Sequence, residues 1–274
     1  MLEGRRAQAW HYQPAFRRPR HFHEEPEINL VTRGQGTLLL GDRAIEVTAG
    51  SLIWFPPGLD HYLAAASADF ELLTVGFQPA LIDAYAREHA ESPTFTRPLQ
   101  QLDAADYRKL ADILDNVQSF ADHQSAEQRS LQVLRALIRL SPSTAAPLGH
   151  RAARYVLSDP TASRDRLARA LCSNRGDVSR QFHRDHGMTL RRYRNTLRVL
   201  EFLRLHDKGV TNLTRAAIEA GFGSYSQCHR VFRSLLEHSP REYLRTRNHT
   251  HALDLFEPLD DVPFPRLLSQ TVTY

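Results

Sequence analysis

Residues 221–233 read GFGSYSQCHRVFR, and residues 239–243 read SPREY. Four side chains in these two stretches repeat an arrangement found fifty positions earlier in the chain. The matched pairs are Arg180 with Arg230, Phe182 with Phe232, Arg191 with Arg241, and Tyr193 with Tyr243. A repeat of this period indicates one structural unit built twice. The C-terminal part of the chain is therefore predicted to contain two copies of one unit.

The first copy has the signals of two short helices joined by a turn. Ser163 is placed to cap a first helix, and the pair Cys172-Ser173 marks a turn after it. Asn174 is placed to cap a second helix, which turns Val178 and Phe182 inward. Two helices joined by a turn of three or four residues form a helix-turn-helix unit.

The second copy follows a connecting helix, which the apolar spacing predicts from about Leu190 to His206. Its first helix begins near Thr211, the pair Gly221-Phe222 makes its turn, and Ser224 caps its second helix. We predict that Phe182 and Phe232 anchor the second helix of each unit in that unit's core.

The second helix of such a unit lies in the DNA major groove. Arginine matches two acceptor atoms of guanine at once, and glutamine matches adenine in the same way. The candidate DNA-binding residues are the caps and outward positions of the two second helices: Asn174, Arg175, Asp177, Ser179, Arg180, Ser224, Tyr225, Ser226, Gln227, His229, Arg230 and Arg233. Arg180 and Arg230 either read bases or fix the helices through phosphate and intramolecular contacts, and the sequence leaves both roles open.

Charge is sorted along the chain in a way that favours a polyanionic partner. Residues 150–247 hold 20 Lys+Arg against 9 Asp+Glu, whereas the rest of the chain holds 15 against 22. Only Lys109 and Lys208 are lysines. Genome composition could explain the preference for arginine, but it does not explain the separation of sign.

Residues 150–247 resemble the DNA-binding domain of the AraC/XylS family of transcriptional regulators, and residues 221–233 and 239–243 are close to that family's signature. The resemblance implies a ligand-responsive regulator whose two reading helices enter adjacent major-groove segments of a double-stranded operator. A small-molecule effector, such as a sugar, is then expected, with RNA polymerase and a second copy of the chain as candidate partners. Activation and repression both remain open.

Five positions depart from the family pattern: Cys172, Gly176, Ala216, Cys228 and Glu237. Cys172 stands where glycine is usual, which strains the backbone if φ is positive there. Gly176 weakens the first reading helix by roughly 1 kcal/mol relative to alanine and removes one side chain that could contact a base. We therefore expect the second reading helix to carry more of the sequence choice.

The N-terminal part reads as β structure. Short apolar runs at 28–31, 37–40, 44–47 and 52–55 are separated by glycine turns, which suggests a sandwich or barrel. The fold class is therefore α+β with two domains. We expect a cupin-like effector-sensing barrel at 1–95, a helical brace or dimerisation region with a linker at 96–149, the DNA-binding domain at 150–247, and an unassigned tail at 248–274.

Helical spacing follows the β region. The two apolar stripes are Leu110, Ile113, Leu114 and Val117, then Leu131, Leu134, Leu137 and Ile138. Such stripes bury one helix face, either against the barrel or in the seam of a homodimer.

His21, His23 and Glu27, with His61 further on, resemble the ligand set of metal-binding cupins. Alternate strand residues point the same way, so His21 and His23 share a face. Three imidazoles and a carboxylate suit Fe, Mn, Ni, Cu or Zn. The alternative is that these side chains, with Trp54 near the second motif, bind a small effector or one another, so that no cofactor is required.

Other classes are disfavoured. Neither an apolar run long enough to span a membrane nor a secretory signal is present, and Cys172 and Cys228 lack metal-type spacing, so a reducing bacterial cytoplasm is expected. We expect no enzymatic activity. The alternative is a cupin metalloenzyme with an appended DNA-binding module, which only the four candidate ligands favour.

Overall fold

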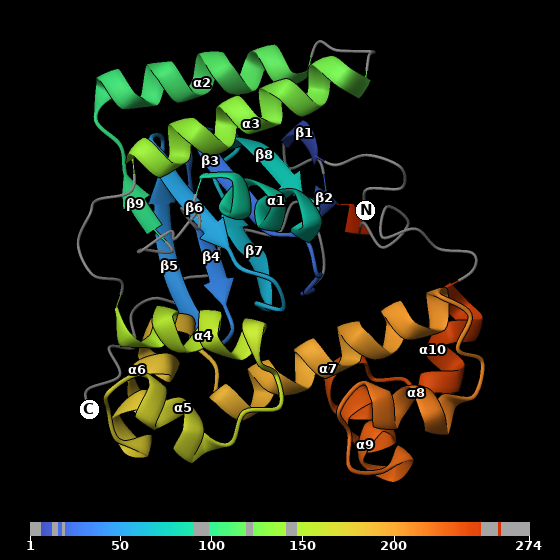
Figure 1. Cartoon of the computed structure of the whole chain (residues 1–274). Coiled ribbons are helices and arrows are strands. Elements are labelled where there is room, and N and C mark those ends of the chain that lie inside the picture. The colour runs from blue at the N-terminus through green and yellow to red at the C-terminus, as the bar shows by residue number, and fades with distance from the viewer. Residues whose placement is uncertain are drawn as a thin grey trace.

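The computed structural model describes residues 7–12, 16–17, 20–89, 99–118, 123–140, 147–247 and 257–258. A β-rich domain comes first and a helical region follows it, as the sequence predicts (Figure 1). Ten strands lie in the described residues: β1 (Ala7–Tyr12), β2 (Phe16–Arg17), β3 (Glu27–Arg33), β4 (Gln35–Leu40), β5 (Arg43–Thr48), β6 (Ser51–Phe55), β7 (His61–Ala66), β8 (Glu71–Phe77), β9 (Leu99–Gln101) and β10 (Glu257–Pro258).

Two antiparallel sheets form the N-terminal barrel. One has the strand order β1-β8-β3-β6-β9 and the other has the order β5-β4-β7. Apolar side chains from both sheets meet in one buried cluster between them, which includes Leu40, Phe55 and Leu63. Strand alternation sends neighbouring side chains to the opposite face, so Leu52 and Trp54 pack on the outside of β6.

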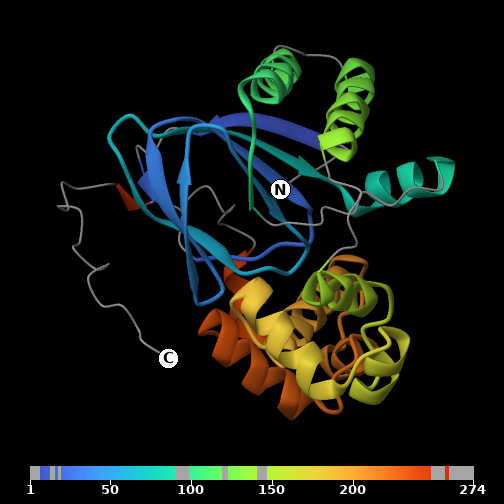
Figure 2. The same cartoon turned by 90° about the vertical axis from the view of Figure 1, so that its left-hand side faces the viewer.

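Two long helices cover the outer face of the five-stranded sheet (Figures 1 and 2). They are α2 (Ala104–Gln118) and α3 (His123–Leu140), and they follow α1 (Pro79–His89). Leu110, Leu114, Leu134 and Leu137 are buried in a second cluster with the outer residues of the sheet. The predicted brace is therefore confirmed for these positions, while the side chains of Val117 and Ile138 lie outside the described residues.

Two predicted boundaries need correction. The barrel does not end at residue 95, because β9 pairs with β6 through Ser51 and Gln101. The sequence of β9 is short and largely polar, so it does not predict a strand. Its strand character becomes visible only in the structure, where it pairs with the edge of β6. The helical region begins at Leu148, slightly before the predicted position 150.

The helical region contains seven helices within the described residues: α4 (Leu148–Ser158), α5 (Arg164–Ala170), α6 (Arg175–His186), α7 (Leu190–Asp207), α8 (Leu213–Glu219), α9 (Tyr225–Leu236) and α10 (Pro240–Arg247). The pair α5–α6 is the first helix-turn-helix unit, and α8–α9 is the second. Helix α7 is the predicted connector, and its buried Phe202 joins the core of the second unit.

The first unit is docked directly on the barrel, which the sequence did not predict. Barrel residues and residues of α4, α6 and α7 share one continuous hydrophobic cluster. The N–H of Asp42 donates to the carbonyl of Gly187 at 2.8 Å. A β-carbon on Gly187, whose φ is +64°, would lie only 2.0 Å from the carbonyl oxygen of Leu40. Glycine is therefore required for this close approach.

The predicted linker lies largely in residues 141–146, outside the described residues. Most of the unassigned tail also lies outside them. Its described part is β10, in which Glu257 pairs with Arg17 of β2.

Candidate DNA-reading surface and barrel site

The first reading helix, α6, begins where the sequence predicts. The side chain of Asn174 caps it by accepting a hydrogen bond from the N–H of Asp177 at 2.8 Å. Ser163 caps the preceding helix in the same way, through the N–H of Arg166 at 3.1 Å. Phe182 is 0% exposed, which confirms its predicted place in the core.

Two residues that stand where the family usually has glycine, Cys172 and Glu237, adopt the left-handed backbone conformation. Cys172 has φ +51° and Glu237 has φ +60°. Residues with a β-carbon adopt this region at a cost of order 1–3 kcal/mol, so each position stores strain that a glycine would not. The conditional prediction of strain at Cys172 is confirmed.

The second reading helix, α9, is capped by Ser224, whose Oγ accepts from the N–H of Gln227 at 3.1 Å. The side-chain carbonyl of Gln227 reaches back to the N–H of Gly223 at 2.8 Å. Gln227 thus reinforces the start of the helix as well as lying on its predicted DNA side. Phe232 is 0% exposed, again as predicted.

The predicted outward residues do lie outward, with differing degrees of exposure. Arg175, Ser179, Arg180, Ser226, Arg230 and Arg233 are exposed, along with the caps Asn174 and Ser224, whereas Asp177, Tyr225, Gln227 and His229 are half-buried. No ligand or DNA is present, so their contacts with bases remain predictions.

The two matched arginines differ in what surrounds them. Arg180 forms an ion pair with Asp177 one turn back in α6, and its guanidinium lies over Gly176. The residue matching Asp177 in α9 is the neutral Gln227. Arg230 is exposed, and it makes no hydrogen bond or ion pair with any residue that the structure describes. The guanidinium of Arg230 is therefore available for a base, while that of Arg180 must first leave a carboxylate.

The repeated phenylalanine and tyrosine of each unit pack against each other. The rings of Phe182 and Tyr193 lie 5.3 Å apart in the first unit, and those of Phe232 and Tyr243 lie 6.2 Å apart in the second. Each pair joins a reading helix to the helix that follows it. The first pair has an added role, because the Tyr193 hydroxyl donates to the carbonyl of Pro57 in the barrel at 3.0 Å.

A buried histidine pair lies at the packed interface of α4 and α6. The rings of His150 and His186 are 4.6 Å apart. Desolvation by burial, with a smaller effect of neighbouring His150, lowers the pKa of His186 from 6.5 to about 3. Burial also lowers the pKa of His150. Both rings are therefore neutral in the folded unit at physiological pH.

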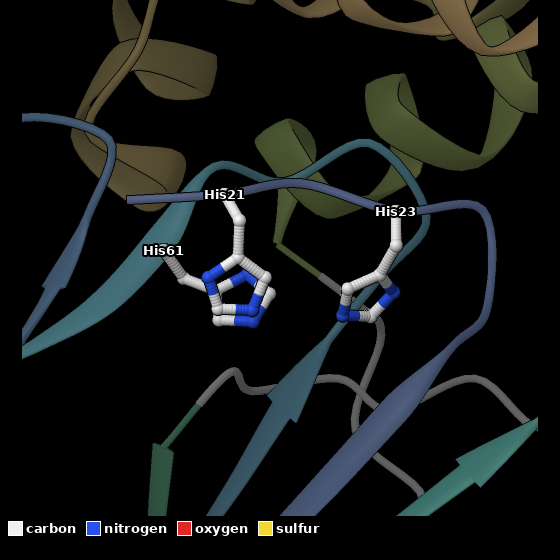
Figure 3. A group of neighbouring side chains, drawn as sticks. All are labelled: His21, His23 and His61. Carbon is white, nitrogen blue, oxygen red and sulfur yellow. The ribbon is translucent and has the colours of Figure 1, made fainter. Parts of the chain in front are cut away.

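The structure brings three of the predicted metal ligands together at one end of the barrel (Figure 3). One nitrogen from each of His21, His23 and His61 lies within 4.8 Å of the other two. The backbones of His21 and His61 bond to each other in both directions, at 2.9 and 3.2 Å. The ring of Phe55 stacks on His61 at 4.1 Å between centroids and walls the cluster on the barrel side.

Hydrogen bonds orient two of the three rings. Nδ1 of His61 lies 2.8 Å from the carbonyl of Leu59, and Nδ1 of His23 lies 2.7 Å from the carbonyl of Glu25. A carbonyl only accepts, so each Nδ1 carries a proton, and in a neutral ring Nε2 would be the nitrogen that offers a lone pair to a metal. Glu27, the fourth predicted ligand, lies beside the cluster, because its carboxylate is 3.3 Å from Nε2 of His23, but the group whose atoms lie within 4.8 Å of one another holds only the three histidines. We call these three histidines and Glu27 the barrel site.

Trp54 does not belong to the barrel site. It packs in the cluster on the outer face of β6, under α2 and α3. The structure therefore separates Trp54 from the other candidate pocket residues, because residue 54 is one step out of phase with Phe55 on the same strand.

Sequence reasoning missed two buried polar residues, Asn29 and Thr74, which pair directly across β3 and β8. Asn29 shares the strand face of Glu27, is 6% exposed, and its Oδ1 accepts no hydrogen bond from the described residues. The spacing of two residues between Glu27 and Asn29 could have indicated that their side chains share one face of the strand.

Residues 4–157 match the family described as AraC-like ligand binding domain, and residues 167–246 match a helix-turn-helix domain. Comparison with curated proteins gives no match. Among the helices that the structure describes, none is long and apolar enough to cross a membrane.

Solved structures resemble the chain at low identity. Crystal structures of ToxT from Vibrio cholerae include one from strain O395 (TM-score 0.48, 14% identity, 89% of this chain, 99% of that chain). Another, from strain SCE256, has unsaturated fatty acid bound (TM-score 0.47, 16% identity, 87% and 94%). The AraC-like transcriptional activator CuxR also resembles it (TM-score 0.33, 14% identity, 78% of each chain). Because its ligand-binding domain spans more than half of the sequence and a helix-turn-helix domain follows, the chain belongs to the AraC-like family of ligand-responsive, DNA-binding transcription regulators.

Proposed function

We propose that this regulator senses a divalent transition-metal ion at the barrel site and reads DNA with α6 and α9. The observation that carries the proposal is the convergence of three histidine nitrogens within 4.8 Å of one another beside Glu27. Metal-binding histidines commonly donate the other ring N–H to a carbonyl, which is how His23 and His61 are held.

The donor set narrows the class of ion. Three imidazoles and one carboxylate suit Fe, Mn, Ni, Cu or Zn, whereas calcium and magnesium prefer an all-oxygen set. In this role His21, His23 and His61 supply nitrogen and Glu27 supplies charge compensation. The ion would hold together two segments of chain that carry these residues.

A small polar effector, such as a sugar, is the second candidate occupant. It is favoured by the buried Oδ1 of Asn29, which lacks a hydrogen-bond partner in the described residues, and by Thr74 opposite it. A hydroxyl group reaching this face of the sheet would satisfy Asn29.

The metal content of the purified protein distinguishes a bound metal ion from a small polar effector. The full chain should be purified without a metal-affinity column and examined by elemental analysis, then titrated with Zn²⁺ by calorimetry after chelation. We expect about one ion per chain, lost in the variant His21→Ala/His23→Ala. The control is His183→Ala, which removes an exposed histidine of α6. If the native chain neither holds a transition metal nor binds Zn²⁺, the metal proposal is wrong and sugars are tested in its place.

DNA reading is tested by selecting bound sequences from random DNA with and without Zn²⁺. Binding should fall steeply as salt rises, because the arginines of the helical region displace counterions from phosphates. Salt-independent binding would contradict the assignment of this surface.

Further parts of the proposal concern assembly and location. We propose a homodimer through α2 and α3, contact with RNA polymerase, residence in the bacterial cytoplasm, and no enzymatic turnover at the barrel site. Sedimentation of wild type and of variants in the exposed residues of α3 tests the dimer. Turnover at the barrel site would favour the alternative of a cupin metalloenzyme with a DNA-binding module.

A further inference from the structure

The segment Arg20–Glu24 carries two of the barrel-site histidines, and its other residues interact with the DNA-binding region either directly or through Asp60. His21 and His23 point to the same side of the segment, toward His61 (Figure 3). Arg20, Phe22 and Glu24 alternate with them in the sequence and interact with other partners. The same short stretch thus takes part in two sites.

Arg20 connects to α7 through one buried carboxylate. Its Nε lies 2.7 Å from Oδ2 of Asp60, and the same oxygen lies 2.8 Å from Nη2 of Arg192 near the start of α7. The side chain of Asp60 is 5% exposed, whereas those of Arg20 and Arg192 are 37% and 36% exposed, so the shared carboxylate is buried and the two guanidinium groups reach solvent. Asp60 directly precedes His61 in the chain.

Phe22 and Glu24 connect to the far half of α7. Phe22 packs against the hydrophobic cluster of the second unit, to which α7 contributes Phe202. The pKa of Arg204 is raised mainly by its hydrogen bond to Glu201, and the negative charge of Glu24 adds to the effect. Interactions of this segment, one of them through Asp60, therefore reach both the start and the far half of α7.

The segment that carries the third histidine also contacts α7. The hydroxyl of Thr196 donates to the carbonyl of Gly58 at 3.0 Å, three residues before His61. Every histidine of the barrel site is therefore borne by a segment whose neighbouring residues bind α7. A ligand that fixes His21 and His23 against His61 restrains both segments at once.

We infer that occupation of the barrel site is transmitted to the two reading helices through Asp60 and the segment Arg20–Glu24, with α7 as the receiving element. This inference deepens the proposed function and rests on it. If α7 is already restrained before DNA binds, less conformational entropy is lost on DNA binding. Occupation of the barrel site should therefore strengthen DNA binding. Linkage then requires DNA to strengthen ion binding by the same factor.

The test measures that linkage in the full chain. Zn²⁺ affinity is measured by calorimetry with and without a selected DNA site, and DNA affinity by fluorescence anisotropy with and without Zn²⁺. We expect a coupling factor of about 5- to 150-fold in the native chain. Asp60→Asn should bring the coupling factor close to 1 and leave the Zn²⁺ affinity measured without DNA unchanged. Asp42→Asn is the matched control, because Asp42 also pairs with Arg20, at 3.2 Å, but has no side-chain bond to α7.

The outcomes separate this inference from the proposed function. Absence of Zn²⁺ binding by the native chain overturns the metal proposal. Native binding of both Zn²⁺ and DNA without linkage, or full linkage in Asp60→Asn, overturns the transmission route alone. A measurement without metal adds an independent check: DNA should slow hydrogen exchange in residues 20–24 of the native chain, and unchanged exchange there would also overturn the route.

Discussion

Replacing Arg230 by alanine tests which helix chooses the DNA sequence. The guanidinium of Arg230 is exposed and has no partner among the described residues, so the whole side chain is free to contact a base. A bidentate arginine–guanine contact is worth about 1–3 kcal/mol, which corresponds to roughly 5- to 150-fold in affinity. We expect Arg230→Ala to cause a loss of this size and to relax the preference at one base pair.

The matched change Arg180→Ala should do less. Arg180 must leave Asp177 before it binds DNA, and an exposed ion pair of this kind is worth about 0.2–1 kcal/mol. Asp177→Asn removes this competitor and should strengthen DNA binding through Arg180. The backbone N–H of residue 177 still donates to Asn174 in that variant, so the helix cap is retained.

Fluorescence anisotropy with a panel of single-base variants, at two salt concentrations, measures these effects. If Arg230→Ala weakens binding equally on every sequence and lowers the salt slope by about 1, then Arg230 contacts a phosphate and the reasoning is refuted. A larger loss of sequence preference from Arg180→Ala would also refute it.

Four further outcomes follow from the packing and charge described above. Phe232→Ala should lower the free energy of unfolding by about 3–5 kcal/mol, as measured by urea denaturation. Gly187→Ala should release the first unit from the barrel and increase its proteolysis, whereas Gly209→Ala, with φ +92° and nothing within 4 Å of the added carbon, serves as the control. Because the pKa of folded His186 lies near 3 and the ordinary value is 6.5, stability should be full above pH 6.5 and fall below it by up to about 1.4 kcal/mol per pH unit. His186→Gln should flatten that slope in urea titrations at pH 7 and pH 5, and an unchanged slope would contradict the buried neutral ring. Replacing Cys172 by glycine should raise the thermal midpoint, because glycine removes the strain at φ +51°.

Local signals predicted much of the helical region. Ser163, Asn174 and Ser224 cap helices where expected because a cap depends on one side chain and an N–H three residues away. The repeated phenylalanines were placed correctly because helical spacing fixes the buried face. His21 and His61 are brought together by an isolated bridge between their backbones, although the strand expected at His21 and His23 is not formed there.

Contacts between distant residues could not be predicted in this way. The bond from Tyr193 to Pro57 and the ion pair from Arg192 to Asp60 each join parts of the chain more than a hundred residues apart, and no spacing in the sequence records them. Trp54 lies apart from the histidines because strand phase, which proximity in the sequence does not reveal, turns its side chain to the outer face of the sheet. The spacing of three residues between Asp177 and Arg180 could have predicted their ion pair. DNA binding was predicted for the same arginine side chain, and the sequence does not decide between the two.

Helix α7 has a mechanical consequence as a lever arm. Its 18 residues span about 27 Å, and its first turn is tied to the barrel through Arg192, while its far end carries the second unit. A tilt of roughly 10° at the barrel end would displace the far end by about 5 Å, because displacement grows with the length of the arm. One turn of the double helix is about 34 Å, so such a tilt would shift α9 by roughly one seventh of a turn relative to the groove segment next to the one that α6 occupies. A small tilt at the barrel would thereby become a larger displacement of the second reading helix along the DNA.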